Sequence, residues 1–138
     1  MGLLDGKVAF VTGAARGQGR SHAIRLAQDR RIVARKADIR DLAAVRSVLD
    51  AGLAELGGRL DIVVANAAII SWPHDTWDID LDQFRELVKA GFAEMNLLPI
   101  PWVDPVDVSN AIVWLASDAA RYVTGVTLPI DAGNHLKC

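Results

Sequence analysis

The sequence lacks the features that mark disulfide-rich, nucleic-acid-binding and membrane-spanning proteins. Its single cysteine, Cys138, is the last residue, so the chain can form no internal disulfide. The formal charge is −2, and Lys and Arg are scattered along the 138 residues rather than grouped in a basic patch. The longest uncharged stretch, residues 62–74, is too short to span a bilayer. We therefore expect a cytoplasmic protein with no nucleic-acid and no membrane partner.

Two further absences narrow the kind of protein. The opening "MGLLDGKVAFVTG" has no basic region before its apolar run, so we do not expect it to act as a secretion signal. His74 and His135 have no Cys or His at ligand spacing, which predicts no metal site. A chain of this length can bury a core without a disulfide or a metal.

Short β-branched runs alternate with helical patterns along the chain. This alternation is typical of an α/β fold with a parallel sheet. No repeat or linker divides the pattern, so we predict one domain over residues 1–138, a Rossmann-like doubly wound parallel sheet reduced in strand number. The predicted strands are 7–12, 32–37, 61–66 and 125–131, and the predicted helices are 20–28, 42–56, 80–93 and one that starts after 104.

Residues at the helix ends support these boundaries. Asp41 is a predicted N-cap, and Gly57 with Gly58 ends the helix that it opens. Asp80 and Gln83 resemble a capping box, and Asp104 is a predicted cap before Pro105. The predicted inner face of this last helix comprises Val108, Ala111, Ile112, Leu115 and Ala116.

Three glycines occupy the turn between the first predicted strand and the first predicted helix. Gly13 can leave the strand through dihedrals that would cost another residue about 1–2 kcal/mol. Gly17 and Gly19 lack the Cβ atoms that would keep a ligand, or the strand, away from the backbone. The free amides and the positive dipole end of the following helix favour a phosphate. The spacing is G-x-x-x-G-x-G rather than G-x-G-x-x-G, and we interpret the turn as a pyrophosphate cradle.

This turn, "TGAARGQGR", with "DIVVANA" downstream resembles the short-chain dehydrogenase/reductase family. The opening residues 1–27, "RRIVARKADIRD" and "NAIVWLASDAARYVTGVTLPIDAG" are similar to one subgroup, the carveol-dehydrogenase-like enzymes described as mycofactocin-coupled. The resemblance implies an NAD-dependent oxidoreductase that interconverts a small apolar, terpene-like secondary alcohol and its ketone by hydride transfer. It leaves NADP open as the cofactor. It also implies a homo-oligomer, because intact relatives are usually tetramers.

The resemblance further implies which residues meet the cofactor. Asp38 would meet the adenine amino group, with Ile39 as its apolar neighbour. By spacing alone Asp38 could instead bind the ribose, if its strand lies beside the first one. The family has Asn-Ala-Gly after its central strand, and Ala68 departs from that pattern; it would strain the turn if the backbone there needs a positive φ. The implied cofactor-binding residues are Gly13, Ala15, Arg16, Gly17, Gln18, Gly19, Asp38, Ile39, Asn66, Ala67 and Ala68.

The catalytic residues of the family are missing from this sequence. Its chemistry needs a serine and a Tyr-x-x-x-Lys pair, but the only tyrosine, Tyr122, is followed four places later by Val126. Ser71 and Lys89 match no catalytic position, so we assign no catalytic residue and expect the 138 residues to be inactive by themselves. The alternatives are a non-catalytic dinucleotide-binding module and an unstable fragment. The sequence leaves open whether the chain is a true deletion or part of a longer protein.

The joins in the chain indicate where family sequence is absent. One lies near residues 29–30 and the other near 88–89, so two of the remaining strands would lose their partners. We predict a repaired sheet in the order 2-1-3-4, with strands numbered along this chain. The loop 71–77 holds two tryptophans and, with Trp102, is a candidate lining for the substrate. His22 is expected on the helix surface or beside the cofactor.

Overall fold

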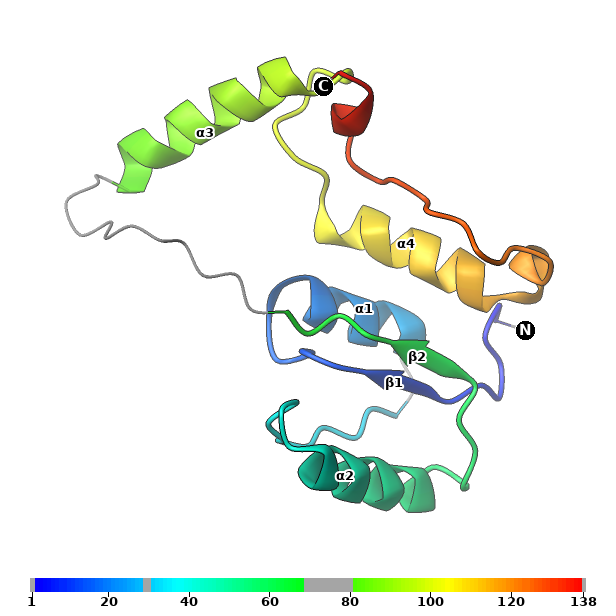
Figure 1. Ribbon diagram of the computed structural model, residues 1–138. Coiled ribbons are helices and arrows are strands. Elements are labelled where there is room, and N and C mark those ends of the chain that lie inside the picture. The colour runs from blue at the N-terminus through cyan, green and yellow to red at the C-terminus, as the bar shows by residue number, and fades with distance from the viewer. Residues whose placement is uncertain (1, 29–30, 69–80, 138) are drawn as a thin grey trace.

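The computed structural model describes residues 2–28, 31–68 and 81–137. Two short strands and four α-helices form the main regular structure of this part of the chain (Figure 1). The elements in chain order are β1 (Ala9–Val11), α1 (Gly17–Ala27), α2 (Leu42–Glu55), β2 (Ile62–Val64), α3 (Leu81–Met95), α4 (Pro105–Ala116) and two 3₁₀ turns, η1 (Asp118–Ala120) and η2 (Asn134–Leu136).

β1 and β2 form a two-stranded parallel sheet with Phe10 opposite Val63. Hydrogen bonds extend the pairing at both ends, because Ile62 N donates to Val8 O at 3.1 Å and Thr12 N donates to Val64 O at 3.1 Å. α1 and α4 cover one face of this sheet and α2 covers the other (Figure 1). The predicted α/β class with a reduced, doubly wound parallel sheet is therefore confirmed.

The hydrophobic core lies between the sheet and the pair formed by α1 and α4. Leu4, Leu26 and Val113 are its buried members. The sheet residues that pack against them are Ala9, Val11, Ile62 and Val64. These positions alternate along each strand, as expected where one face of a sheet is buried.

α2 forms as predicted, with both of its ends fixed by local hydrogen bonds. The Asp41 carboxylate accepts from Ala43 N at 2.9 Å and from Ala44 N at 3.0 Å, and Gly58 N donates to Leu53 O at 2.8 Å. None of the α2 residues is fully buried. A sheet of two short strands is too narrow to cover the apolar stripe of a 14-residue helix.

The predicted strand at 32–37 is wrong. Arg31 and Arg35 both pair with the Glu55 carboxylate at the end of α2, and the segment has no strand assignment. The chain uses this segment to pass from the α1 face to the α2 face of the sheet (Figure 1). The predicted order 2-1-3-4 is therefore also wrong, because β2 rather than residues 32–37 is the neighbour of β1.

The predicted strand at 125–131 is wrong for a related reason. A strand is stable only when a neighbouring strand pairs with its amides and carbonyls. Residues 125–130 are coil, and the hydrogen bonds that hold the end of this segment come from a loop: Leu97 N and Leu98 N both donate to Ala132 O at 3.0 Å.

Several predicted helix boundaries need correction. α1 begins at Gly17, three residues earlier than predicted, and the Asp104 side chain makes no capping hydrogen bond to α4. Leu115 is 39% exposed, whereas Ser109 and Val113 are the buried residues of α4. α3 continues to Met95, and the predicted Asp80–Gln83 capping box lies outside the described residues and side chains.

The end of α3 is joined to the last residues of the described chain. Asn134 Nδ2 donates to Asn96 Oδ1 at 3.1 Å, and Lys137 Nζ donates to Asn96 O at 3.1 Å.

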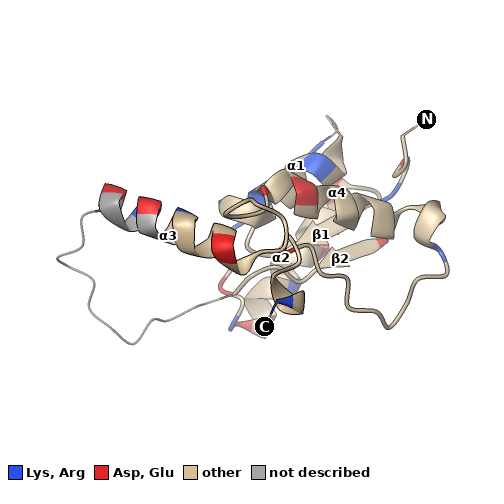
Figure 2. Ribbon diagram, turned by 90° about the horizontal axis from the view of Figure 1, so that it is seen from above, with Lys and Arg blue, Asp and Glu red and all other residues tan. Residues whose placement is uncertain are grey.

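Lys and Arg do not gather on one element (Figure 2). Within the described residues, no helix combines the length and the apolar character needed to cross a membrane.

Candidate functional site

The turn between β1 and α1 requires glycine at Gly13 for two reasons. Its φ is +68°, in the left-handed region that other residues seldom adopt. A Cβ at Gly13 would also lie 2.9 Å from Ala67 Cα and 3.0 Å from Asn66 Nδ2. The loops that follow β1 and β2 therefore approach each other more closely than a side chain at Gly13 would allow.

Gly19 and Gly17 serve different purposes in this turn. A Cβ at Gly19 would lie 2.3 Å from the Gly13 carbonyl oxygen and 2.4 Å from Asn66 Nδ2, so Gly19 lets α1 pack onto the turn. Gly17 has a φ of +57°, and apart from its chain neighbours and the backbone of its own helix no described atom lies within 4 Å of the position of its missing Cβ. Gly17 therefore leaves its side of the turn open.

Asn66 and Thr12 fix the turn to the loop after β2. Asn66 Nδ2 donates to Thr12 O at 2.9 Å, and Ala67 N donates to Thr12 Oγ1 at 3.0 Å. The structure thus brings Asn66 and Ala67 against the glycine turn. Ala68 is exposed and does not have a positive φ, so alanine causes no backbone strain at this position.

The first turn of α1 has no acidic side chain that would compete with a bound anion for the free backbone amides. The N-cap is Arg16, whose extended backbone has a φ of −154° and whose side chain makes no capping hydrogen bond. The first turn of α1 contains no acidic residue. These amides and the positive end of the helix dipole form an environment suited to an anion. Ala15 and Gln18 are exposed beside them.

A groove of about 460 Å³ opens beside this helix start, between α1 and the first residues of α4. Arg20 and Arg25 contribute positive charge to it, and none of its lining residues is acidic. Its lining residues are Gly17, Arg20, Ser21, Ile24, Arg25, Gln28, Pro105 and Val106. The starts of α1 and α4 therefore lie next to each other.

Asp38 and Ile39 precede α2 and are exposed. Asp38 Oδ2 accepts from an Arg40 terminal nitrogen at 2.6 Å, and hydrogen bonds from the Arg40 side chain and backbone lower the pKa of the Asp38 carboxyl. No hydrogen bond between described residues connects Asp38 to the glycine turn. Figure 1 shows the segment before α2 at the same end of the sheet as that turn.

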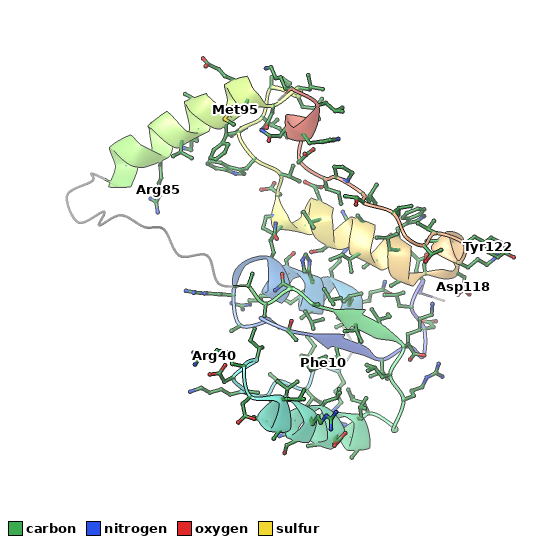
Figure 3. All side chains as sticks on the ribbon, in the orientation of Figure 1. Phe10, Arg40, Arg85, Met95, Asp118 and Tyr122 are labelled. Carbon is green, nitrogen blue, oxygen red and sulfur yellow. The ribbon has the colours of Figure 1, made fainter. Side chains whose placement is uncertain are left out.

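Tyr122 and Lys89 lie in settings unlike a catalytic pair. Tyr122 is 85% exposed, with the Arg121 guanidinium 4.8 Å from its ring centroid. Figure 3 shows Tyr122 and Arg40 at opposite ends of the molecule. Lys89 pairs with Glu86 on α3 at 2.6 Å. Ser71 and the two tryptophans of 71–77 lie outside the described residues, and Trp102 is 49% exposed.

Sequence reasoning missed a buried polar group between α1 and α4. His22 was expected on the helix surface or beside the cofactor; it is 3% exposed, so the surface position is wrong. Its Nδ1 lies 2.8 Å from the Oγ atom of Ser109, a residue with no exposed surface. Burial lowers the pKa of His22. Its spacing of four residues from the core residue Leu26 is the signal that could have placed it on the inner face.

The parallel strands and the glycine turn at their carboxyl end define a Rossmann-type α/β fold with a candidate nucleotide-binding turn. A family described as enoyl-(acyl carrier protein) reductase matches residues 92–135. A short-chain type dehydrogenase/reductase of Mycolicibacterium smegmatis is 28% identical, in an alignment that spans 99% of each chain. The (−)-trans-carveol dehydrogenase of Rhodococcus erythropolis is 25% identical over 99% of this chain and 100% of the relative.

A solved structure has the same fold. The carveol dehydrogenase of Mycobacterium avium, crystallised in complex with NAD, superposes with a TM-score of 0.81 at 26% identity, covering 99% of this chain and 100% of that one. The chain thus resembles carveol dehydrogenases of the short-chain dehydrogenase/reductase type in both sequence and fold. The alignment with the M. smegmatis relative has 278 positions, so about half of them have no counterpart among the 138 residues of this chain.

Proposed function

We propose that the chain binds NAD at the glycine turn and is a shortened relative of a family of alcohol oxidoreductases. The observation that carries the proposal is the division of roles among the three glycines. Gly13 and Gly19 pack the turn against Asn66 and Ala67, whereas Gly17 faces open space at the uncapped start of α1. A turn that only reversed the chain would need Gly13 and Gly19, but it would not need open space at Gly17.

The residues present fit the diphosphate of a dinucleotide. The first-turn amides of α1 would hold its oxygens, and the positive charge of Arg16 and Arg20 would favour its negative charge. Gln18 would lie beside the phosphates and the ribose. Asp38, ionised and held by Arg40, would accept a hydrogen bond from either the adenine amino group or a ribose hydroxyl. In an intact family member with its catalytic residues, the bound cofactor would supply hydride chemistry at the carbon that carries the hydroxyl of the substrate.

We further propose a small apolar alcohol or its ketone, of the terpene class, as the substrate of the intact family member. The name of the R. erythropolis relative, a carveol dehydrogenase, supports this choice. The use of NAD rather than NADP and the coupling to mycofactocin belong to the same proposal, as do a cytoplasmic location and a homo-oligomeric state.

The 138 residues should bind without catalysing, because the chain has no Tyr-x-x-x-Lys pair and its one tyrosine is at the far end from the cradle (Figure 3). We propose that the chain is one internally deleted dinucleotide-binding domain. Arg31 and Arg35 pair with Glu55 of α2 instead of joining the sheet, which supports a deletion at the first join.

The test combines mass, binding and turnover on one preparation. Intact mass spectrometry first verifies a chain of 14.9 kDa. Titration of NADH, followed by its fluorescence, should then show saturable binding, and incubation with carveol and NAD should give no NADH. Steady turnover by the verified chain would refute the proposal that the 138 residues are catalytically inactive. Broad, poorly dispersed NMR spectra together with absent binding would instead identify an unstable fragment.

A further inference from the structure

The hydrogen bonds around Ser109 determine the protonation of His22. Ser109 Oγ donates its only proton to the Pro105 carbonyl oxygen at 2.8 Å, one turn back along α4. It also lies 2.8 Å from Ser21 Oγ and 2.8 Å from His22 Nδ1. Because a hydroxyl has one proton and two lone pairs, Ser109 must accept from both of these neighbours. His22 therefore carries a proton on Nδ1.

The contact between α1 and α4 consists of successive levels, about one per helical turn, and this network occupies one of them. The two helices run in the same direction, and this contact is the most extensive helix–helix packing in the described chain (Figure 1). Four residues further along each helix, Leu26 and Val113 form an apolar level in the core. The polar level, His22 with Ser109, is the one nearer to the glycine turn.

The polar level lies close to the amides of the cradle. Ser21 and His22 follow Gly19 by two and three residues, and Gly19 is itself in contact with the Gly13 carbonyl. Pro105, whose carbonyl oxygen receives the Ser109 proton, lines the same groove as Gly17. A rotation or shift of the first two turns of α1 would break the His22–Ser109 bond and would change the direction of the cradle amides together.

We propose that His22 is a positioning residue for the dinucleotide cradle: its Nδ1–H bond to Ser109 holds the start of α1 against the start of α4. This inference rests on the proposed binding of NAD. His22 acts through α1 and touches no ligand. Its loss should weaken dinucleotide binding more than an equally destabilising change at the apolar level of the same helix pair.

The experiment compares NADH dissociation constants of the full chain and four variants, each at a temperature where circular dichroism shows it folded. His22→Leu and Ser109→Ala should each weaken binding by about tenfold, the size expected for losing one buried hydrogen bond. His22→Asn, which keeps a donor near the position of Nδ1, should restore binding to within about threefold of the wild type. Val113→Ala should lower stability and leave binding within about threefold.

A second measurement tests the network without any ligand. ¹⁵N NMR of the His22 ring should show the proton on Nδ1 and an unprotonated Nε2 at neutral pH. A proton on Nε2 alone would overturn the network. A wild-type chain that binds NADH, with His22→Leu no weaker than Val113→Ala, would overturn the positioning role and leave the proposed function standing. A folded wild-type chain that binds no NADH would overturn both.

Discussion

Replacing Gly19 with alanine tests whether the turn after β1 is a built cradle. Gly19 lies in the first turn of α1, and its added Cβ would meet the Gly13 carbonyl oxygen at 2.3 Å and Asn66 Nδ2 at 2.4 Å. Ordinary contacts begin near 3.4 Å. The start of α1 and the turn would therefore have to separate by about 1 Å.

The cost of that separation follows from what the new methyl group meets. One neighbour is backbone, and the other is a side chain already held by the Thr12 carbonyl at 2.9 Å, so neither can rotate away freely. Overpacking of this kind costs about 1–3 kcal/mol, and we expect the upper part of that range for Gly19→Ala. For a chain of this length, this corresponds to a Tm lower by roughly 10 °C. NADH affinity should fall with it, because the parts that separate are the two sides of the cradle.

Gly52→Ala is the matched control. Gly52 is inside α2, has no positive φ, and has no described atom within 4 Å of the position of an added Cβ. Alanine there should raise the free energy of unfolding by about 0.5–1 kcal/mol and leave NADH binding unchanged. Urea unfolding followed by circular dichroism, with NADH titration of the same samples, measures both quantities. A Gly19→Ala chain with wild-type stability and wild-type affinity would refute the reasoning about this turn.

Two further predictions concern stability. Asp41→Ala removes the acceptor for Ala43 N and Ala44 N and should lower the free energy of unfolding by about 0.5–2 kcal/mol, as measured by urea titration. An unchanged urea midpoint would show that the Asp41 cap does not stabilise the fold. Because burial lowers the pKa of His22 below 6.5, the unfolded chain binds a proton that the folded chain resists. Stability should therefore fall as pH falls from 6.5 towards the lowered pKa, and His22→Asn should flatten that part of the profile; equal profiles would contradict it.

The parts of the fold that were predicted correctly depend on short-range chemistry. The Asp41 cap and the Gly58 hydrogen bond at the end of α2 join residues a few positions apart, so the local sequence is sufficient to predict them. The same holds for Gly13, whose positive φ follows from the need to turn sharply after β1. The close approach of Gly13 to Asn66 and Ala67 was not predicted, because these residues are far from Gly13 in the sequence.

The errors concern features that need a distant partner. The runs 32–37 and 125–131 have β-branched residues in a strand-like pattern, but the described part of the chain contains no strand that pairs with them. His22 was expected on the helix surface or beside the cofactor, because nothing in its neighbourhood along the chain indicates that Ser109, in another helix, provides a partner for it.

The sequence by itself determined both ends of α2 and the sharp turn at Gly13, because these features depend on bonds within a few residues. The tertiary structure alone decided which strands exist, how α1 rests on α4, and the burial of His22. These outcomes require two segments far apart in the chain to satisfy each other's hydrogen bonds, and a local pattern contains no information about whether the second segment is in place.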